Sequence, residues 1–179
     1  MNTKLHKLVL AVGATAMMTG VMAADNATAT ASATVLAPIA VSKSADLSFG
    51  NFAPTGSAGS VTIKTDGSRT GSSVFLSTVN TVAPSAAKFD VTGSGASTYS
   101  IDYTGSSTAL ASTATESDTM AYTMCSALTA AAACSGTVSS GTLSAGAQSI
   151  YVGGVLTVGA NQAAHTDYTG TIKVTVAYN

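Results

Sequence analysis

The stretch "HTDYTGTIKVTVAYN" at residues 165–179 decides the fold class. From Thr171 onward it alternates polar and apolar residues, which is the period of a strand with one buried face. The apolar face would carry Ile172, Val174, Val176 and Tyr178. Chain ends fray unless something pairs with them, so such regular alternation predicts a terminal strand held inside a sheet.

Segments of the same kind recur along the chain, and glycine-, serine- and asparagine-rich turns separate them. They are "TVLAPIAV" (34–41), "DLSFG" (46–50), "SVTIK" (60–64), "SVFLS" (73–77), "AKFDVTG" (87–93), "TYSIDYTG" (98–105), "MAYTM" (120–124), "SIYV" (149–152), "VLTVG" (155–159) and "GTIKVTVAY" (170–178). The stretch from 60 to 76 is typical of a hairpin turning at Asp66 and Gly67. Helix and strand do not alternate, so we predict an all-β, immunoglobulin-like sandwich with Greek-key connections.

Residues 1–23 have the pattern of a signal peptide. Two lysines precede an apolar run over 8–18, and Val21 and Ala23 supply the small-residue pattern before the expected cleavage site. The run is shorter than the roughly 20 residues that a membrane span needs. No later stretch is long and apolar enough to span a membrane. We therefore expect an exported protein and, with a bacterial origin assumed, passage through the periplasm of a Gram-negative cell to the cell surface or beyond it.

The charge and the cysteines limit which partners the chain can bind and which sites it can form. Without the two lysines of the signal peptide, five basic side chains remain beside eight acidic ones, so no basic patch is available for nucleic acid. Cys125 and Cys134 are the only cysteines, and in an exported chain we expect them to form a disulfide. A metal site lacks a second ligand pair at matching spacing. Between the cysteines, "ALTAAAAC" (127–134) favours a single helical turn.

Catalytic residues are scarce beyond the signal peptide. The part of the chain after the signal peptide has one histidine, His165. It lies in a polar turn, so we interpret it as a solvated surface residue and not as a catalytic base. Asp90 and Asp102 could form a glycosidase-like carboxylate pair, but each alternates with apolar neighbours and belongs on the solvent side of a strand. The chain carries no phosphate-binding glycine loop and no serine elbow. We expect no catalytic activity and no cofactor.

An extension at residues 24–36 precedes the domain that we expect over 37–179. It has the period of a strand but small side chains, because alanines and one valine alternate with Thr or Ser. The apolar positions are Ala27, Ala29, Ala31, Ala33 and Val35. Such a segment suits addition to the edge of a sheet, including the edge of a neighbouring molecule. It could equally be a flexible tether, or the first strand of a sandwich that is complete in itself.

Two segments carry a resemblance to known families: "ATVLAPIAVSKSADLSFGNFAP" (33–54) and "YVGGVLTVGANQAAHTDYTGTIKVTVAYN" (151–179). Together they resemble the bacterial domain of unknown function 4402, over essentially the whole chain after the signal peptide. More distantly, "DLSFGNF" (46–52) and "DYTGTIKVTVAYN" (167–179) look like spore coat U type subunits of archaic chaperone-usher pili. That resemblance implies a donor segment at 24–36 and an acceptor groove bordered by Ile172, Val174, Val176 and Tyr178. It also implies a periplasmic chaperone and an outer-membrane usher.

Three functions follow as hypotheses. The first is a structural subunit of a fimbrial or surface filament, assembled by strand addition between copies. The second is a monomeric surface module, an adhesin or carbohydrate-binding domain, which would need exposed aromatic rings. Tyr99, Tyr103 and Tyr122 suit core packing better than ligand contact. The third, a secreted hydrolase, lacks a base.

Overall fold

The structure is a computed structural model that describes residues 25–115 and 117–179. The chain divides into two units, Met1–Thr34 and Val35–Asn179. The expected signal peptide, residues 1–23, lies outside the described residues. In the first unit, residues 25–34 are exposed and have no regular secondary structure. The second unit is described by itself below.

The second unit consists of strands joined by turns and loops. The strands are β1 (Ala40–Ala45), β2 (Phe52–Pro54), β3 (Gly59–Ile63), β4 (Arg69–Ser72), β5 (Val74–Leu76), β6 (Ala87–Thr92), β7 (Thr98–Asp102), β8 (Ala109–Ser112), β9 (Thr119–Ala127), β10 (Ser140–Thr142), β11 (Ala147–Val158), β12 (Tyr168–Thr169) and β13 (Thr175–Tyr178). The described residues include no helix, and hence none that could cross a membrane. The all-β prediction is confirmed, while the finer immunoglobulin-like, Greek-key assignment stays a prediction.

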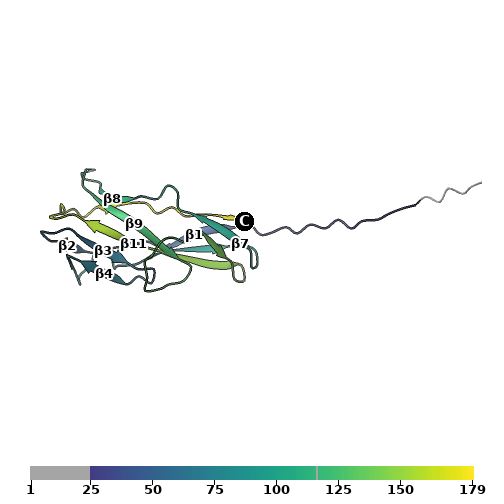
Figure 1. Ribbon diagram of the computed structural model, residues 1–179, viewed down its shortest axis with the longest axis horizontal. Helices are drawn as coiled ribbons and strands as arrows, with labels where there is room; N and C mark the ends of the chain where they lie inside the picture. Colours follow the sequence, from purple (N-terminus) through teal and green to yellow (C-terminus); the bar gives the residue numbers. More distant parts are fainter. Residues whose placement is uncertain (1–24, 116) are drawn as a thin grey trace, which may run out of the picture. The chain divides into compact units, whose positions relative to one another are not determined.

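The strands pair antiparallel in three sheets (Figure 1). The main sheet has the order β1-β6-β11-β9-β8-β12. The strand β11 is long enough to pair with β6 along its first half and with β3 along its second half, and β4 pairs with β3. A second sheet has the order β10-β7-β13, and β2 pairs with β5 alone. Both β1 and β13 are therefore edge strands.

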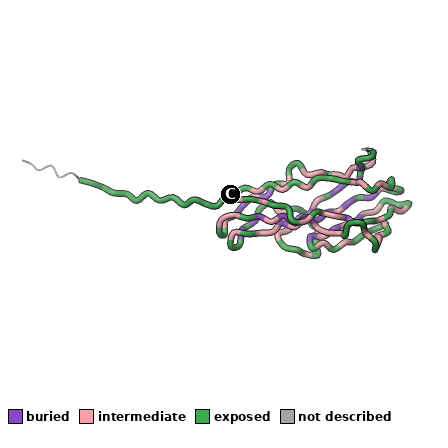
Figure 2. Tube along the Cα trace, turned by 180° about the vertical axis from the view of Figure 1, so that it is seen from behind, coloured by how far each residue is buried: buried purple, intermediate pink, exposed green. Residues whose placement is uncertain are grey.

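The core lies between these layers, and Figure 2 shows its buried residues along the inside of the domain. Strand β6 alternates buried and less buried residues, as a strand with one covered face must. Two apolar clusters result. The first gathers β6 and β11 residues against Tyr99 and Ile101 of β7, and the second surrounds Phe49 and Tyr122 near β2 and β5. The burial of apolar side chains in these two clusters supplies the main driving force for packing the sheets against each other.

Two glycines explain why the segments predicted at 149–152 and 155–159 form one strand. At Gly154 a Cβ atom would lie 2.1 Å from the Tyr122 ring, so only glycine lets the ring pack against the strand. The Tyr122 hydroxyl donates a hydrogen bond to the Gly153 carbonyl, with 2.9 Å between the oxygens. Burial raises the pKa of this tyrosine. The glycine pair therefore continues the strand beneath an aromatic ring.

The disulfide joins Cys125 and Cys134, with 5.2 Å between the Cα atoms. The loop that it closes is not helical, so the expected helical turn is wrong. Instead the loop runs along the β3–β4 turn. The Thr65 N–H donates to the Ala133 carbonyl at 3.1 Å, and the Thr65 hydroxyl donates to the Ala131 carbonyl at 2.9 Å. These tertiary hydrogen bonds replace the ones that a helical turn would form.

Several strand boundaries differ from the sequence predictions. The segment at 34–41 becomes a strand only at Ala40, which pairs with the last residue of β6, so no partner exists further back. The segment at 46–50 forms a single bridge, between Ser48 and Ser85. The hairpin turns at Asp66 and Gly67 as expected, but its second arm is β4, and the predicted segment at 73–77 pairs with β2 as β5.

Candidate functional site: a groove beside the C-terminal segment

The C-terminal segment, defined here as residues 168–178, is paired along one side only. It begins as β12 beside β8 and ends as β13 beside β7. Between these strands the Thr171 carbonyl accepts a hydrogen bond from the Ser107 N–H at 2.8 Å. The Lys173 N–H donates to the Ser106 hydroxyl at 2.9 Å. The backbone N–H and C=O groups of the odd-numbered residues therefore point toward β8, β7 and the residues that connect these two strands.

The even-numbered residues of this segment turn their backbone groups the other way, because successive residues of an extended chain alternate. Within the described part of the chain, the backbone N–H and C=O of Ile172 and Val174 form no hydrogen bond. No ladder is assigned over 170–174, although the sequence predicts one strand over 170–178. The prediction of one continuous strand over 170–178 is thus wrong, because 170–174 joins no ladder, and the even-numbered residues of this stretch form a free edge among the described residues.

Across from this edge lies β1, the terminal strand of the main sheet. It pairs with β6 on one side, and its register shifts at a bulge between Lys43 and Ala45. The chain then continues through Asp46 and Leu47 toward Phe49 without a ladder. Two sheet edges therefore face each other in the domain.

A groove of about 260 Å³ lies between the two edges. One wall is formed by Lys43 and 45–47, and the other by 168–172. Deeper residues of the lining belong to the two apolar clusters, and they are Phe49, Ala87, Phe89, Leu110 and Tyr122. The floor between the two edges is thus made of core side chains, of which Phe49, Ala87, Phe89 and Tyr122 are themselves buried.

The structure places the four C-terminal residues predicted for strand addition on one face. Each is half-buried and packs against the first apolar cluster, while the odd-numbered residues between them are exposed. The four are Ile172, Val174, Val176 and Tyr178, and Ile172 also lines the groove. The five predicted positions of the extension are all exposed, and Val35 has 94% of its surface accessible. Pairing between the two sets stays a prediction.

Tyr178 ties the beginning of the domain to its end. Its hydroxyl accepts a hydrogen bond from the Ser94 N–H at 2.6 Å and donates one to the Ala37 carbonyl at 2.8 Å. A Cβ atom at Gly93 would lie 2.4 Å from this hydroxyl oxygen, so the glycine makes room for it. This tie could not be predicted from the sequence, because no local pattern links three positions so far apart in the chain.

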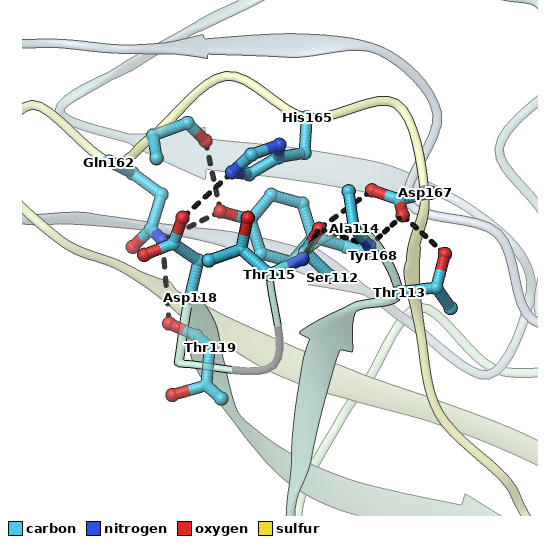
Figure 3. Close-up of polar contacts among 11 residues, drawn as sticks. Ser112, Thr113, Ala114, Thr115, Asp118, Thr119, Gln162, His165, Asp167 and Tyr168 are labelled. Carbon is cyan, nitrogen blue, oxygen red and sulfur yellow. Dashed lines mark hydrogen bonds and ion pairs between the residues drawn. The ribbon is translucent and has the colours of Figure 1, made fainter.

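A polar cluster holds the other end of the C-terminal segment (Figure 3). The Tyr168 hydroxyl accepts from the Gln162 side-chain amide at 3.0 Å and donates to the Ala163 carbonyl at 2.9 Å. His165 packs edge-on against the Tyr168 ring, and its Nε2 lies 2.7 Å from a carboxylate oxygen of Asp118. Only 23% of the His165 side chain is exposed, so the predicted solvated histidine is wrong. The pair connects the turn after β8 to the loop before β12.

Asp167 makes the second connection in this cluster. Its carboxylate accepts hydrogen bonds from the hydroxyls of Thr113 and Ser112, the latter at 2.9 Å, and from the Ala114 N–H at 2.8 Å. The bond to Thr113, followed by the bond to Ser112, lowers the pKa of Asp167 to about 2. Figure 3 shows the carboxylate facing these donors. The ionised form is thus favoured and fixes the start of β12.

Other carboxylates do not converge on a reaction centre. Asp90 of β6 accepts from the Ser149 hydroxyl at 2.7 Å and pairs with Lys88 at 3.0 Å, and the Ser149 bond is the main reason why its pKa falls to about 2. Asp102, exposed on β7 of the other sheet, accepts from its own neighbour Thr104. Among the described residues no three potential metal ligands cluster. The groove is therefore the feature that suits binding.

The geometry defines a class: a small all-β domain with an open apolar groove between two sheet edges. The chain belongs to the family described as domain of unknown function (DUF4402), whose model matches residues 39–178. The predicted family membership is confirmed over nearly all of the second unit. No curated protein and no solved structure matches the chain.

Proposed function

We propose that the protein is an exported structural subunit of a fimbrial or cell-surface filament. In this proposal the groove of one copy receives the extension, residues 24–36, of another copy as an added strand. The single observation that carries the proposal is the groove itself, with core residues on its floor and unpaired backbone on its walls. A strand placed there would cover the core residues on the floor and pair with the free backbone groups on the walls.

Backbone pairing contributes much of the expected stability. An incoming strand would satisfy the free N–H and C=O groups of Ile172, which lines the groove, and, if it continued past the end of the groove, those of Val174. Each such hydrogen bond contributes about 0.5–1.5 kcal/mol net. The groove takes about three of the five apolar side chains at a time, so the apolar face of the extension adds about 2–4 kcal/mol, from about 0.8 kcal/mol for each alanine methyl group and about 2 kcal/mol for Val35. The two terms together support stable association, and neither suffices alone.

The alternation of the extension suits this role. Alanines and Val35 would face the groove floor, and the intervening Thr and Ser residues would face solvent. Residues 25–34 have no regular secondary structure of their own, so their backbone groups are available for pairing. The main competing arrangement uses the same residues within one molecule, as a first strand that fills its own groove.

The alternative function, a monomeric adhesin or carbohydrate-binding module, is favoured less. It needs several exposed aromatic rings, whereas none of the six tyrosines is exposed and the exposed aromatic residue among the described residues is Phe75 of β5, with 71% of its surface accessible. Tyr99 and Tyr122 are buried in the apolar clusters, as the sequence suggests, and Tyr103 is half-buried with its hydroxyl on Ser126. This distribution supports a structural role over ligand stacking.

The same groove also indicates that other proteins take part in assembly. An apolar groove that stays open during export would promote aggregation, so a temporary partner is needed to cover it. We therefore include a periplasmic chaperone and an outer-membrane usher in the proposal, with delivery to the cell surface. The proposal requires no cofactor and no catalytic step.

The test compares the chain that starts at Ala24 with a chain that starts at Leu36. Both are purified from the periplasm and studied by size-exclusion chromatography, electron microscopy and urea unfolding. We expect the longer chain to form filaments, and the shorter one to be monomeric and less stable until a peptide of residues 24–36 is added. A peptide with Ala29, Ala31 and Ala33 replaced by Asp is the matched control and should have no effect. Two equally stable monomers would refute the proposal.

A further inference from the structure

We propose that Val35 is the anchor that sets the register in which the extension enters the groove of another copy. This inference rests on the proposed function and adds to it a specificity-determining residue. The remaining positions of the alternating stripe, Ala27, Ala29, Ala31 and Ala33, carry identical side chains, so the groove cannot distinguish one from another.

The lengths of the groove and of the extension create a register problem. The groove wall from Lys43 to Phe49 would span about 20 Å at about 3.3 Å per strand residue. A strand of about six residues covers that length and directs about three side chains to the floor. The extension offers five such positions between Ala27 and Val35. Several placements, two residues apart, are therefore geometrically possible.

Alanine stripes specify register weakly, because a shift by two residues exchanges one methyl group for another. Val35 is the one member of the stripe whose side chain changes the apolar contact between placements. It is 94% exposed, and its isopropyl group is therefore available to a partner. The next residue, Leu36, would face the opposite side of the added strand.

The two walls differ as pairing partners. They run antiparallel to each other, because Tyr178 meets Ala37 while 168–172 lie opposite 43–47, so an incoming strand is antiparallel to one wall and parallel to the other. The bulge between Lys43 and Ala45 interrupts the β1 wall, so the C-terminal segment offers the more regular edge and favours an incoming strand that runs against it. That direction brings Val35 toward the Tyr168 end of the groove. Leu110 and Phe49 line the floor there as parts of the second apolar cluster. An isopropyl group would gain contacts there that an alanine methyl would not.

The experiment uses the full exported chain with a photo-cross-linking amino acid at Thr30. The residue that it reaches in the neighbouring subunit is identified by mass spectrometry, and the critical concentration for assembly is measured. Wild-type chains should give one cross-linked position. Val35→Ala should raise the critical concentration about tenfold and spread the cross-links over positions two residues apart. The double change Val35→Ala with Ala33→Val should restore one position, displaced by two residues.

Thr34→Val is the matched control, because it adds a valine to the solvent face of the same strand and should change neither readout. Should Val35→Ala keep both the critical concentration and the single cross-link, the groove would still receive a strand and the anchor would be refuted. If wild-type chains neither assemble nor cross-link, the strand-addition function fails, and the anchor fails with it.

Discussion

Replacing Tyr178 by phenylalanine tests the tie between the beginning and the end of the domain. The change removes one oxygen and with it the bonds to the Ser94 N–H and the Ala37 carbonyl, which are 2.6 and 2.8 Å long. Ser94 is half-buried and Ala37 is exposed, so water can replace the second bond more easily than the first. One lost bond of about 1 kcal/mol and a partly unsatisfied N–H lower the free energy of unfolding by about 1.5 kcal/mol.

Urea unfolding measures this loss. With an m-value of about 1.5–2 kcal/mol per molar urea, the midpoint should fall by about 0.8–1 M. Tyr151→Phe is the matched control, because Tyr151 is also half-buried and its hydroxyl forms no hydrogen bond among the described residues. Amide hydrogen exchange at Ser94 should speed up in the first variant and stay unchanged in the second. Equal midpoints for the two variants would refute the tie.

Three further predictions concern the glycine pair, the polar cluster and the disulfide. Gly154→Ala places a Cβ atom 2.1 Å from an aromatic ring and should lower stability by about 1–3 kcal/mol in thermal unfolding, whereas Gly56→Ala, with no heavy atom within 4 Å, should leave it nearly unchanged. The pKa of Asp167 is lowered to about 2, so its contribution to stability is present above the unfolded value near 4 and is lost as the pH falls through 2. Asp167→Asn should therefore flatten the acid side of the stability curve between those limits, and an unchanged curve would contradict the assignment. Opening the loop between Cys125 and Cys134, nine residues apart, should cost about 2–3 kcal/mol, measured by urea unfolding with and without reductant, and an equal midpoint in both would show that the bond does not stabilise the fold.

Period-two alternation allowed much of the fold to be predicted. Strands such as β6 and β7 carry large apolar residues on one face, and their positions agree with the sequence predictions. The strands β2, β4, β8, β10 and β12 were missed, and among them β8 and β10 are short and consist of small or polar residues, apart from Leu110. The strands that they pair with determine their extended conformation. Their own residues have too little β-propensity to predict it.

The groove could be predicted only in part. The alternation over 171–178 correctly identified which side chains face the core. It could not reveal that 170–174 pairs on one side alone, because pairing depends on where segments distant in the chain come to lie, which local alternation does not encode. The polar cluster was missed for a related reason. Its partners, such as His165 and Asp118, are 47 residues apart and carry no recognisable spacing.

The Tyr178 tie also determines how the domain would carry tension. A pull on the extension enters the domain at Ala37 and would load β1 alone if nothing else held that residue. The hydroxyl bond shares the load with β13, on the opposite side of the groove. The load would then reach two ladders, the one between β1 and β6 and the one between β13 and β7. A single oxygen atom near the end of the chain thus divides a mechanical load between two sheets.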